Sequence, residues 1–217
     1  MNMKIKLFIL SLTLSYYSMA SALPNLALVK QELEAYHDSG AYMTDIHTVI
    51  EQAKANLIIQ ANNNTEHKKL ALVLDIDETS ISNYNDLKSV GFGGNNDIWT
   101  KQMLQAQEPA IEPTLELYKL ALKENVKVFF ITGRSVKLES ATEKMLKNDG
   151  YTTWAGLYLR TAIYKTSLAE DYKTAIRKNI TEQGYDIIEN VGDQYSDLIG
   201  GYADAQYKLP NPYYYIA

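Results

Sequence analysis

Two aspartates spaced two residues apart, Asp75 and Asp77, are the residues of this chain best placed to do chemistry. They follow an apolar run, residues 70–74, typical of a buried parallel strand. Positions i and i+2 of an extended segment lie on one face, and strands of open α/β sheets end at the ligand-binding crevice. Acids this close repel each other unless a divalent cation lies beside them. One can then act as a nucleophile while the other transfers protons, which predicts a site for phosphoryl transfer.

The chain alternates expected strands and helices from residue 70 onward. Strands are expected at residues 70–75, 127–131, 154–159 and 186–191, with a short strand at 207–209. Helices are expected at 26–36, 42–61, 98–107, 114–124, 136–148 and 167–183, and residues 80–97 form an expected irregular insert. This alternation predicts an α/β fold, a Rossmann-like three-layer sandwich with a mostly parallel sheet. The two helices before the first strand are expected to form an accessory layer.

The first 22 residues have the composition of a secretory signal peptide. Lys4 and Lys6 precede an apolar core at residues 7–14, and small residues at 20–22 predict cleavage after Ala22. One domain is then expected over residues 23–217, and an uncleaved interfacial anchor is the alternative. The chain has no cysteine to form a disulfide or accept a lipid. We therefore expect an exported protein, periplasmic or secreted, without a stable membrane anchor.

The charge balance argues against binding to polyanions. The whole chain has a net charge of −5, with 21 basic and 26 acidic residues. Removing residues 1–22 deletes Lys4 and Lys6 and no acid, which leaves 19 basic against 26 acidic residues, a net charge of −7. Because nucleic-acid and anionic-membrane binding need a basic face, neither is expected. A phosphate substrate must instead be attracted locally, by a metal and a few placed cations.

Further polar residues follow other expected strands. Thr132 comes directly after one strand, and Asp193 and Asp197 follow another with a spacing that one helical turn would bring together. Lys173 lies near the start of an expected helix, where its ammonium group could neutralise the phosphoryl oxygens. The expected oxygen ligands of a Mg²⁺ ion are Asp75, the backbone carbonyl of Asp77, Asp193 and Asp197.

Together these residues resemble the four motifs of the haloacid dehalogenase-like superfamily. The closer resemblance is to its acid phosphatase branch, which includes secreted and lipoprotein bacterial acid phosphatases of class B and the plant vegetative storage proteins. The segments that carry it are Asp75-Ile-Asp-Glu-Thr79, Ile131-Thr-Gly-Arg134, Tyr172-Lys173 with Arg177-Lys178, Gly192-Asp-Gln-Tyr-Ser-Asp-Leu198 and Lys208-Leu-Pro-Asn-Pro212. The resemblance covers most of residues 25–216.

The resemblance implies roles for individual residues. It makes Asp75 the nucleophile that forms an aspartyl-phosphate, and Asp77 the acid that protonates the leaving group and then the base that activates water. Thr132 and Lys173 would hold the phosphate. The implied metal-binding acids are Asp193 and its companion Asp197, which also orients Lys173. The lipoprotein relatives carry a cysteine at their cleavage site, and this chain does not.

Four other residues are predicted to contact substrate. Gly133 and Arg134 follow the motif threonine, and Arg134 either clamps the substrate or forms a structural salt bridge. Trp99 and Tyr214 correspond to regions whose aromatic residues sandwich a nucleobase or aryl group in the resembling lipoprotein phosphatases, and core packing is the alternative. Arg177, one turn after the motif lysine, is expected to pair with a surface acid.

The sequence leaves two classes of function open. The first is an exported, Mg²⁺-dependent phosphomonoesterase that acts on small phosphate monoesters, with nucleoside monophosphates as one candidate. The second is a non-catalytic storage or phosphate-binding protein on the same scaffold, which the presence of Asp75 and Asp77 disfavours. A dehalogenase would not need Asp77 as a proton donor. Transfer to an acceptor alcohol can compete with hydrolysis, and the oligomeric state is not predicted.

Overall fold

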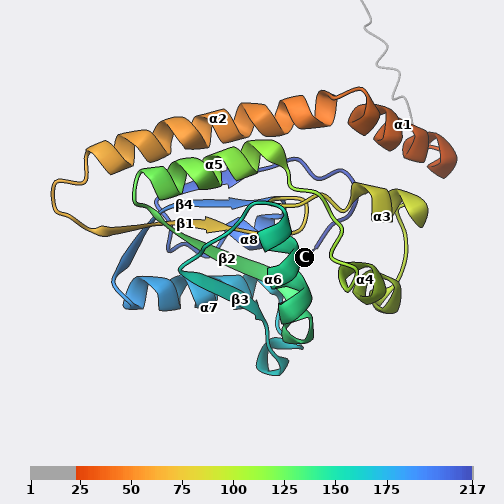
Figure 1. The fold of residues 1–217 in the computed structure, drawn as a ribbon. Helices are drawn as coiled ribbons and strands as arrows, with labels where there is room; N and C mark the ends of the chain where they lie inside the picture. Colours follow the sequence, from red (N-terminus) through yellow and green to blue (C-terminus); the bar gives the residue numbers. More distant parts are fainter. Residues whose placement is uncertain (1–22, 217) are drawn as a thin grey trace, which may run out of the picture.

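The computed structural model describes residues 23–216, which are built around a five-stranded sheet in the order β3-β2-β1-β4-β5. All neighbouring strands are parallel (Figure 1). The strands are β1 (Lys69–Leu74), β2 (Lys127–Ser135), β3 (Gly156–Arg160), β4 (Tyr185–Gly192) and β5 (Ala205–Lys208). The prediction of an α/β sandwich with a mostly parallel sheet is confirmed. The predicted signal peptide, residues 1–22, lies outside the described residues.

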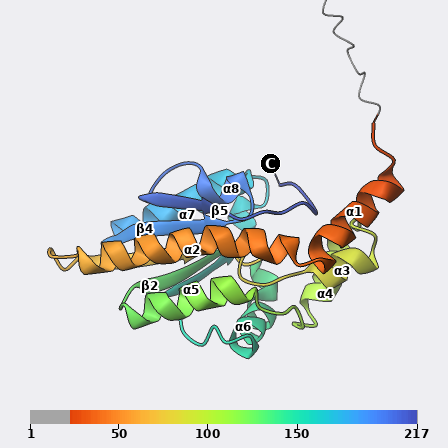
Figure 2. The same ribbon diagram turned by 90° about the horizontal axis from the view of Figure 1, so that it is seen from above.

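Helices cover both faces of this sheet. Helices α2 (Ala41–Asn62) and α5 (Glu112–Lys123) pack against each other on one face, and α7 (Ala169–Glu182) packs on the other (Figures 1 and 2). The remaining helices are α1 (Leu26–Asp38), α3 (Tyr84–Ser89), α4 (Asn96–Met103), α6 (Glu139–Asn148) and α8 (Tyr195–Leu198), with 3₁₀ turns η1 (Val136–Leu138) and η2 (Ala162–Tyr164). In the part of the chain described here, no helix is both long and apolar enough to cross a membrane.

The central strand β1 is apolar on both faces because each face meets helices. Leu70, Leu72 and Leu74 belong to the core shared with α2 and α5. Ala71 and Val73 belong to the core beneath α7. Successive side chains of a strand point to opposite faces, so a strand covered on both sides is a continuous apolar run. Each fully buried leucine contributes about 1.5–3 kcal/mol, which anchors the strand whose end carries the first acidic pair.

Helix α2 is the second of the two N-terminal helices that were expected to form an accessory layer, and it packs on one face of the sheet beside α5. Its buried residues recur at helical spacing along one face: Tyr42, Ile46, Ile50, Ala53 and Leu57. That stripe joins the main core against β1 and α5. Helix α1, in contrast, has no buried residue, and it lies with α3 and α4 at one end of the molecule (Figures 1 and 2).

The insert after the first strand is more helical than its composition indicated. Helix α3 forms inside the stretch expected to be irregular, because Tyr84 and Leu87, three residues apart, both bury their side chains in the core. The side chain of Asn95 caps α4, accepting hydrogen bonds from the amides of Asp97 and Ile98, both at 3.0 Å. This cap starts the helix at Asn96, two residues before the predicted start.

Several other boundaries differ from the predictions. Strand β2 continues to Ser135, past the predicted end at 131, because after a shift in register Ser135 still pairs with Arg160. Strand β3 begins at Gly156, two residues later than predicted, and β5 begins two residues earlier, at Ala205. Helix α7 starts at Ala169 and not at residue 167, because Leu168 is extended and occupies the N-cap position.

Candidate active site

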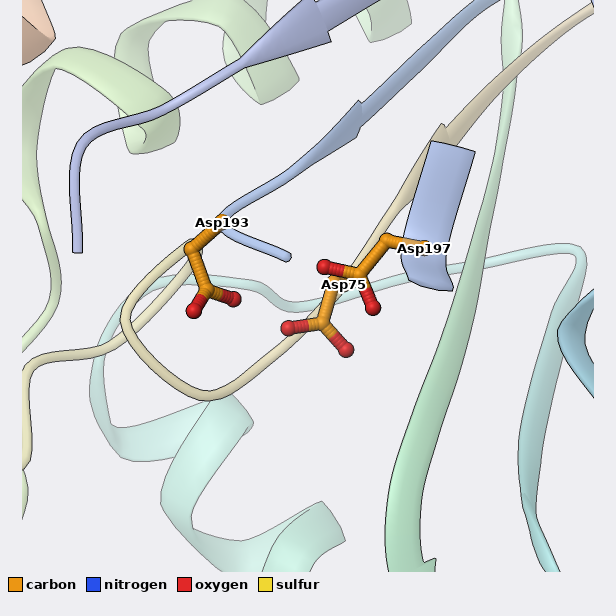
Figure 3. Close-up of side chains that lie close together, drawn as sticks. All are labelled: Asp75, Asp193 and Asp197. Carbon is orange, nitrogen blue, oxygen red and sulfur yellow. The ribbon is translucent and has the colours of Figure 1, made fainter. Parts of the chain in front are cut away.

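Three carboxylates meet at the carboxyl ends of β1 and β4. Figure 3 shows Asp75 directly after β1, Asp193 directly after β4 and Asp197 on the short helix α8. One carboxylate oxygen from each residue lies within 4.8 Å of the others, and all three residues are buried. The backbone of Asp75 is fixed, because its N–H donates to the carbonyl of Val191 at 3.0 Å and its carbonyl accepts from Ser80 Oγ at 2.6 Å. The prediction that these elements converge agrees with this geometry.

The ammonium group of Lys173 lies between two of these carboxylates. Its Nζ is 2.5 Å from Asp75 Oδ1 and 2.5 Å from Asp197 Oδ1, and its side chain is buried. Burial acts to lower the pKa of Lys173, but the two carboxylates outweigh it and raise the pKa, so the group stays charged. Burial raises the pKa of Asp75 well above its usual value, and Lys173 acts in the opposite direction.

Asp193 is held by neutral donors from three segments. Its Oδ2 accepts from Gln194 Nε2 at 2.6 Å and from Asn211 Nδ2 at 2.7 Å, and Thr79 Oγ1 donates to its Oδ1 at 3.2 Å. Burial and the nearby Asp197 raise the pKa of Asp193 to about 6. Thr79, Gln194 and Asn211 lie within the segments that carry the family resemblance, but the sequence analysis gave them no role.

Asp197 is fixed by the backbone of its own helix. Its Oδ2 accepts from the N–H of Gln194 at 2.7 Å, which with the side chain of Gln194 forms a capping box on α8. The approach of Asp197 requires glycine at position 192, because a Cβ there would lie 2.4 Å from Asp197 Cβ and 2.5 Å from its Oδ2. The Gly-Asp spacing is therefore a steric requirement of this site.

Asp77 lies on the rim of the cluster and is bound by Arg134. The guanidinium approaches both oxygens of Asp77, with Nη2 2.8 Å from Oδ1 and Nε 3.1 Å from each oxygen. Asn83 Nδ2 donates to Oδ1 at 3.1 Å, and Thr132 Oγ1 lies 3.5 Å from Oδ2. Burial acts to raise the pKa of Asp77, but Arg134 and Asn83 outweigh it and lower the pKa. The side chain of Asp77 is 18% exposed, so it can reach a substrate from the core edge.

The four residues predicted to contact substrate lie in different surroundings. The side chain of Arg134 is 1% exposed, which matches the salt-bridge alternative; its role as a substrate clamp stays a prediction. Gly133 is exposed, and a Cβ there would meet nothing within 4 Å. Trp99 on α4 packs against the main core and lies over Gly94. Burial raises the pKa of Tyr214, and its backbone carbonyl lies 3.4 Å from Gln194 Nε2.

Two buried acids beside this site had no role in the sequence analysis. Glu78 has a φ of 54° and is fully buried, accepting from the N–H of Asn83 at 2.6 Å and from Tyr42 on α2 at 3.2 Å. Burial raises the pKa of Glu78 to about 8. Glu108 lies 3.7 Å from Arg134 and is also buried. Glu78 lies between the two motif residues Asp77 and Thr79, and that position could have indicated its burial.

The cluster has the chemistry of a divalent-cation site. Three carboxylates are buried together and one ammonium group contacts only two of them, so their ionised forms carry excess negative charge in a place that water cannot screen. Carboxylate oxygens are the donors that Mg²⁺ and similar hard cations prefer. The residues present therefore fit such an ion, which Asp75, Asp193 and Asp197 would hold.

Comparison with known proteins shows the family of this chain. Residues 6–217 match the family model described as HAD superfamily, subfamily IIIB (acid phosphatase). The chain is 36% identical to a stem 28 kDa glycoprotein of Glycine max, over 81% of this chain and 70% of that protein. It is 38% identical to acid phosphatase 1 of Solanum lycopersicum, over 66% of this chain and 58% of that protein. Vegetative storage proteins of Arabidopsis thaliana are also among its relatives.

A solved structure shows the same fold. The class C acid phosphatase from Bacillus anthracis superposes with a TM-score of 0.71 and 21% identity, over 87% of this chain and 86% of that one. The family match and the tomato acid phosphatase among the relatives identify a hydrolase of the phosphomonoesterase class. The chain belongs to subfamily IIIB of the HAD superfamily, the acid phosphatases.

Proposed function

We propose that this protein is an exported, Mg²⁺-dependent acid phosphatase that hydrolyses small phosphate monoesters through an aspartyl-phosphate on Asp75. The observation that carries the proposal is the arrangement of Lys173 between Asp75 and Asp197, with Asp193 beside them at the end of the sheet. A bound divalent cation would offset the repulsion between Asp75 and the phosphoryl oxygens. Nucleoside monophosphates are one candidate class of substrate.

Each of the two chemical steps in this proposal uses particular residues of the chain. An oxygen of Asp75 attacks phosphorus, and the bond to the leaving oxygen breaks as that oxygen takes a proton from Asp77. Asp77 then removes a proton from water, which attacks the same phosphorus and releases inorganic phosphate while restoring Asp75. Lys173 neutralises negative charge on Asp75 and on the phosphoryl oxygens, and we assign Thr132 to phosphate binding.

Asp77 needs a proton before the first step. Arg134 holds the pKa of Asp77 below its usual value, so the protonated form is scarce near neutral pH and becomes more abundant only as the pH falls. This direction supports a rate that rises toward acidic pH while leaving-group protonation limits it. Export after cleavage near Ala22 is the remaining part of the proposal, and it is supported by the composition of residues 1–22.

Turnover assays test the proposal against the storage alternative. Phosphate release from p-nitrophenyl phosphate and from nucleoside monophosphates is measured with Mg²⁺ and with EDTA, for the wild type and for Asp75→Asn. Metal-dependent turnover in the wild type that Asp75→Asn abolishes is the expected result. A folded wild type without turnover from pH 4.5 to 7.5, with several divalent metals, would leave storage or phosphate binding as the function.

A further inference from the structure

Arg177 is a fully buried charge that forms no ion pair among the residues the structure describes. It lies one turn after Lys173 on α7. The prediction that it pairs with a surface acid was wrong, because its side chain is buried. Its Nη1 donates to the carbonyl of Asp197 at 2.5 Å, its Nε to that of Gly201 at 2.9 Å, and its Nη2 to that of Ile199. Burial lowers the pKa of Arg177 to about 10, which leaves it charged at neutral pH.

The three carbonyl acceptors of Arg177 belong to one short segment, the end of α8 and the turn after it, and its Nη2 also donates to Thr174 Oγ1 on α7 at 3.2 Å. Carbonyls at a helix end have no partner within the helix, and a guanidinium can satisfy several of them at once. Asn190 Nδ2 also donates to the carbonyl of Asp197, at 2.8 Å. Two buried side chains therefore fix the backbone of the residue whose carboxylate contacts Lys173.

The same turn is packed closely on α7. Gly200 has a φ of 92°, and a Cβ at this position would lie 2.0 Å from Thr174 Oγ1. The turn therefore lies too close to α7 to accept a side chain at position 200.

We propose that Arg177 is a positioning residue of the metal centre, which holds residues 197–201 against α7 and so fixes the Asp197 carboxylate relative to Asp75 and Asp193. The inference rests on the proposed function in one respect, the binding of a divalent cation by these three acids. Contacts that orient metal ligands are typically worth about 10–100-fold in metal affinity. A guanidinium that only stabilised the turn would affect folding and leave that affinity unchanged.

Two variants separate the charge of Arg177 from its geometry. Arg177→Lys keeps a buried cation but lacks the planar guanidinium fork that reaches three separate carbonyls, and Arg177→Gln also removes the charge. Lys178→Gln is the matched control, because this neighbour is exposed and its ion pair with Glu182 spans 3.7 Å on the surface. Each purified protein is titrated with Mg²⁺ by calorimetry, and the rise of its melting temperature with Mg²⁺ is recorded.

We expect Mg²⁺ affinity to fall about tenfold in Arg177→Lys and about 10–100-fold in Arg177→Gln, and to stay unchanged in Lys178→Gln. Activity lost in Arg177→Lys should return as Mg²⁺ is raised to saturation, since the reacting groups are intact. Affinities within twofold of the wild type in folded variants would overturn the inference, and so would a failure of both variants to fold. A wild type that binds no Mg²⁺ would instead refute the proposed metal site itself.

Discussion

Glu189 in the middle of β4 makes the stability of this protein depend on pH. The residue is fully buried, and its Oε1 accepts from Asn56 Nδ2 on α2 at 2.9 Å. Its Oε2 has no hydrogen-bond partner within the described residues. Burial raises the pKa of Glu189 from 4.5 to about 8. The folded protein therefore keeps a proton on this carboxyl at pH values where the unfolded chain has lost it.

The sign and size of the effect follow from these two pKa values. Between them the unfolded state binds fewer protons than the folded state, so the free energy of unfolding falls as the pH rises from about 4.5 to about 8. Each pKa unit corresponds to about 1.4 kcal/mol, so Glu189 alone should lower stability by about 3 kcal/mol between pH 5 and pH 7.5. Glu189→Gln keeps an oxygen acceptor for Asn56 and cannot ionise.

Urea unfolding in EDTA at these two pH values measures the effect. We expect the loss of unfolding free energy between pH 5 and pH 7.5 to be about 3 kcal/mol smaller in Glu189→Gln than in the wild type. Glu182→Gln is the control, because that side chain is 61% exposed at the end of α7. A pH dependence in Glu189→Gln equal to that of the wild type, within about 0.5 kcal/mol, would refute the reasoning.

Three further predictions concern the site itself. Lys173→Met leaves two buried carboxylates without their cation, so the free energy of unfolding in EDTA should fall by about 3–5 kcal/mol, and Mg²⁺ should partly restore it. A variant as stable as the wild type in EDTA would contradict this. Gly192→Ala puts a Cβ 2.4 Å from that of Asp197, so its melting temperature and Mg²⁺ affinity should fall, whereas Gly93→Ala, with only an ordinary contact at 3.5 Å, should change neither. Asp77→Asn should lower kcat about 10²–10⁴-fold for alkyl phosphates, which need a proton on the leaving oxygen, and less for p-nitrophenyl phosphate. Equal losses for both substrates would remove the assigned acid role.

The framework of the site was predictable because strand ends carry it. An apolar run that ends in Asp75 and another that ends before Asp193 place both acids at one edge of a parallel sheet, whatever the loops do. Matching the spacing of Lys173 to a known family then indicated the cation between the carboxylates. These features depend on local pattern and chain order, which a sequence displays directly.

The parts that were not predicted depend on which side chains become buried. Composition indicated an irregular insert, but Tyr84 and Leu87 form a helix there because their burial outweighs the local preference for turns. Arg177 has the sequence neighbourhood of a surface residue, and only the path of the turn at 197–201 shows that its donors meet carbonyls. Glu78 and Glu189 are acids in apolar surroundings, and the sequence does not display how deeply they lie.

Trapping the covalent intermediate tests the central claim most directly. The wild type is mixed with a nucleoside monophosphate and Mg²⁺, stopped within one turnover and treated with borohydride, which reduces an acyl phosphate to an alcohol. Peptide mass spectrometry should then find homoserine at position 75, and Asp75→Asn and a sample without substrate should show none. Phosphate release by the wild type without any change at Asp75 would contradict the proposal that this residue is the nucleophile.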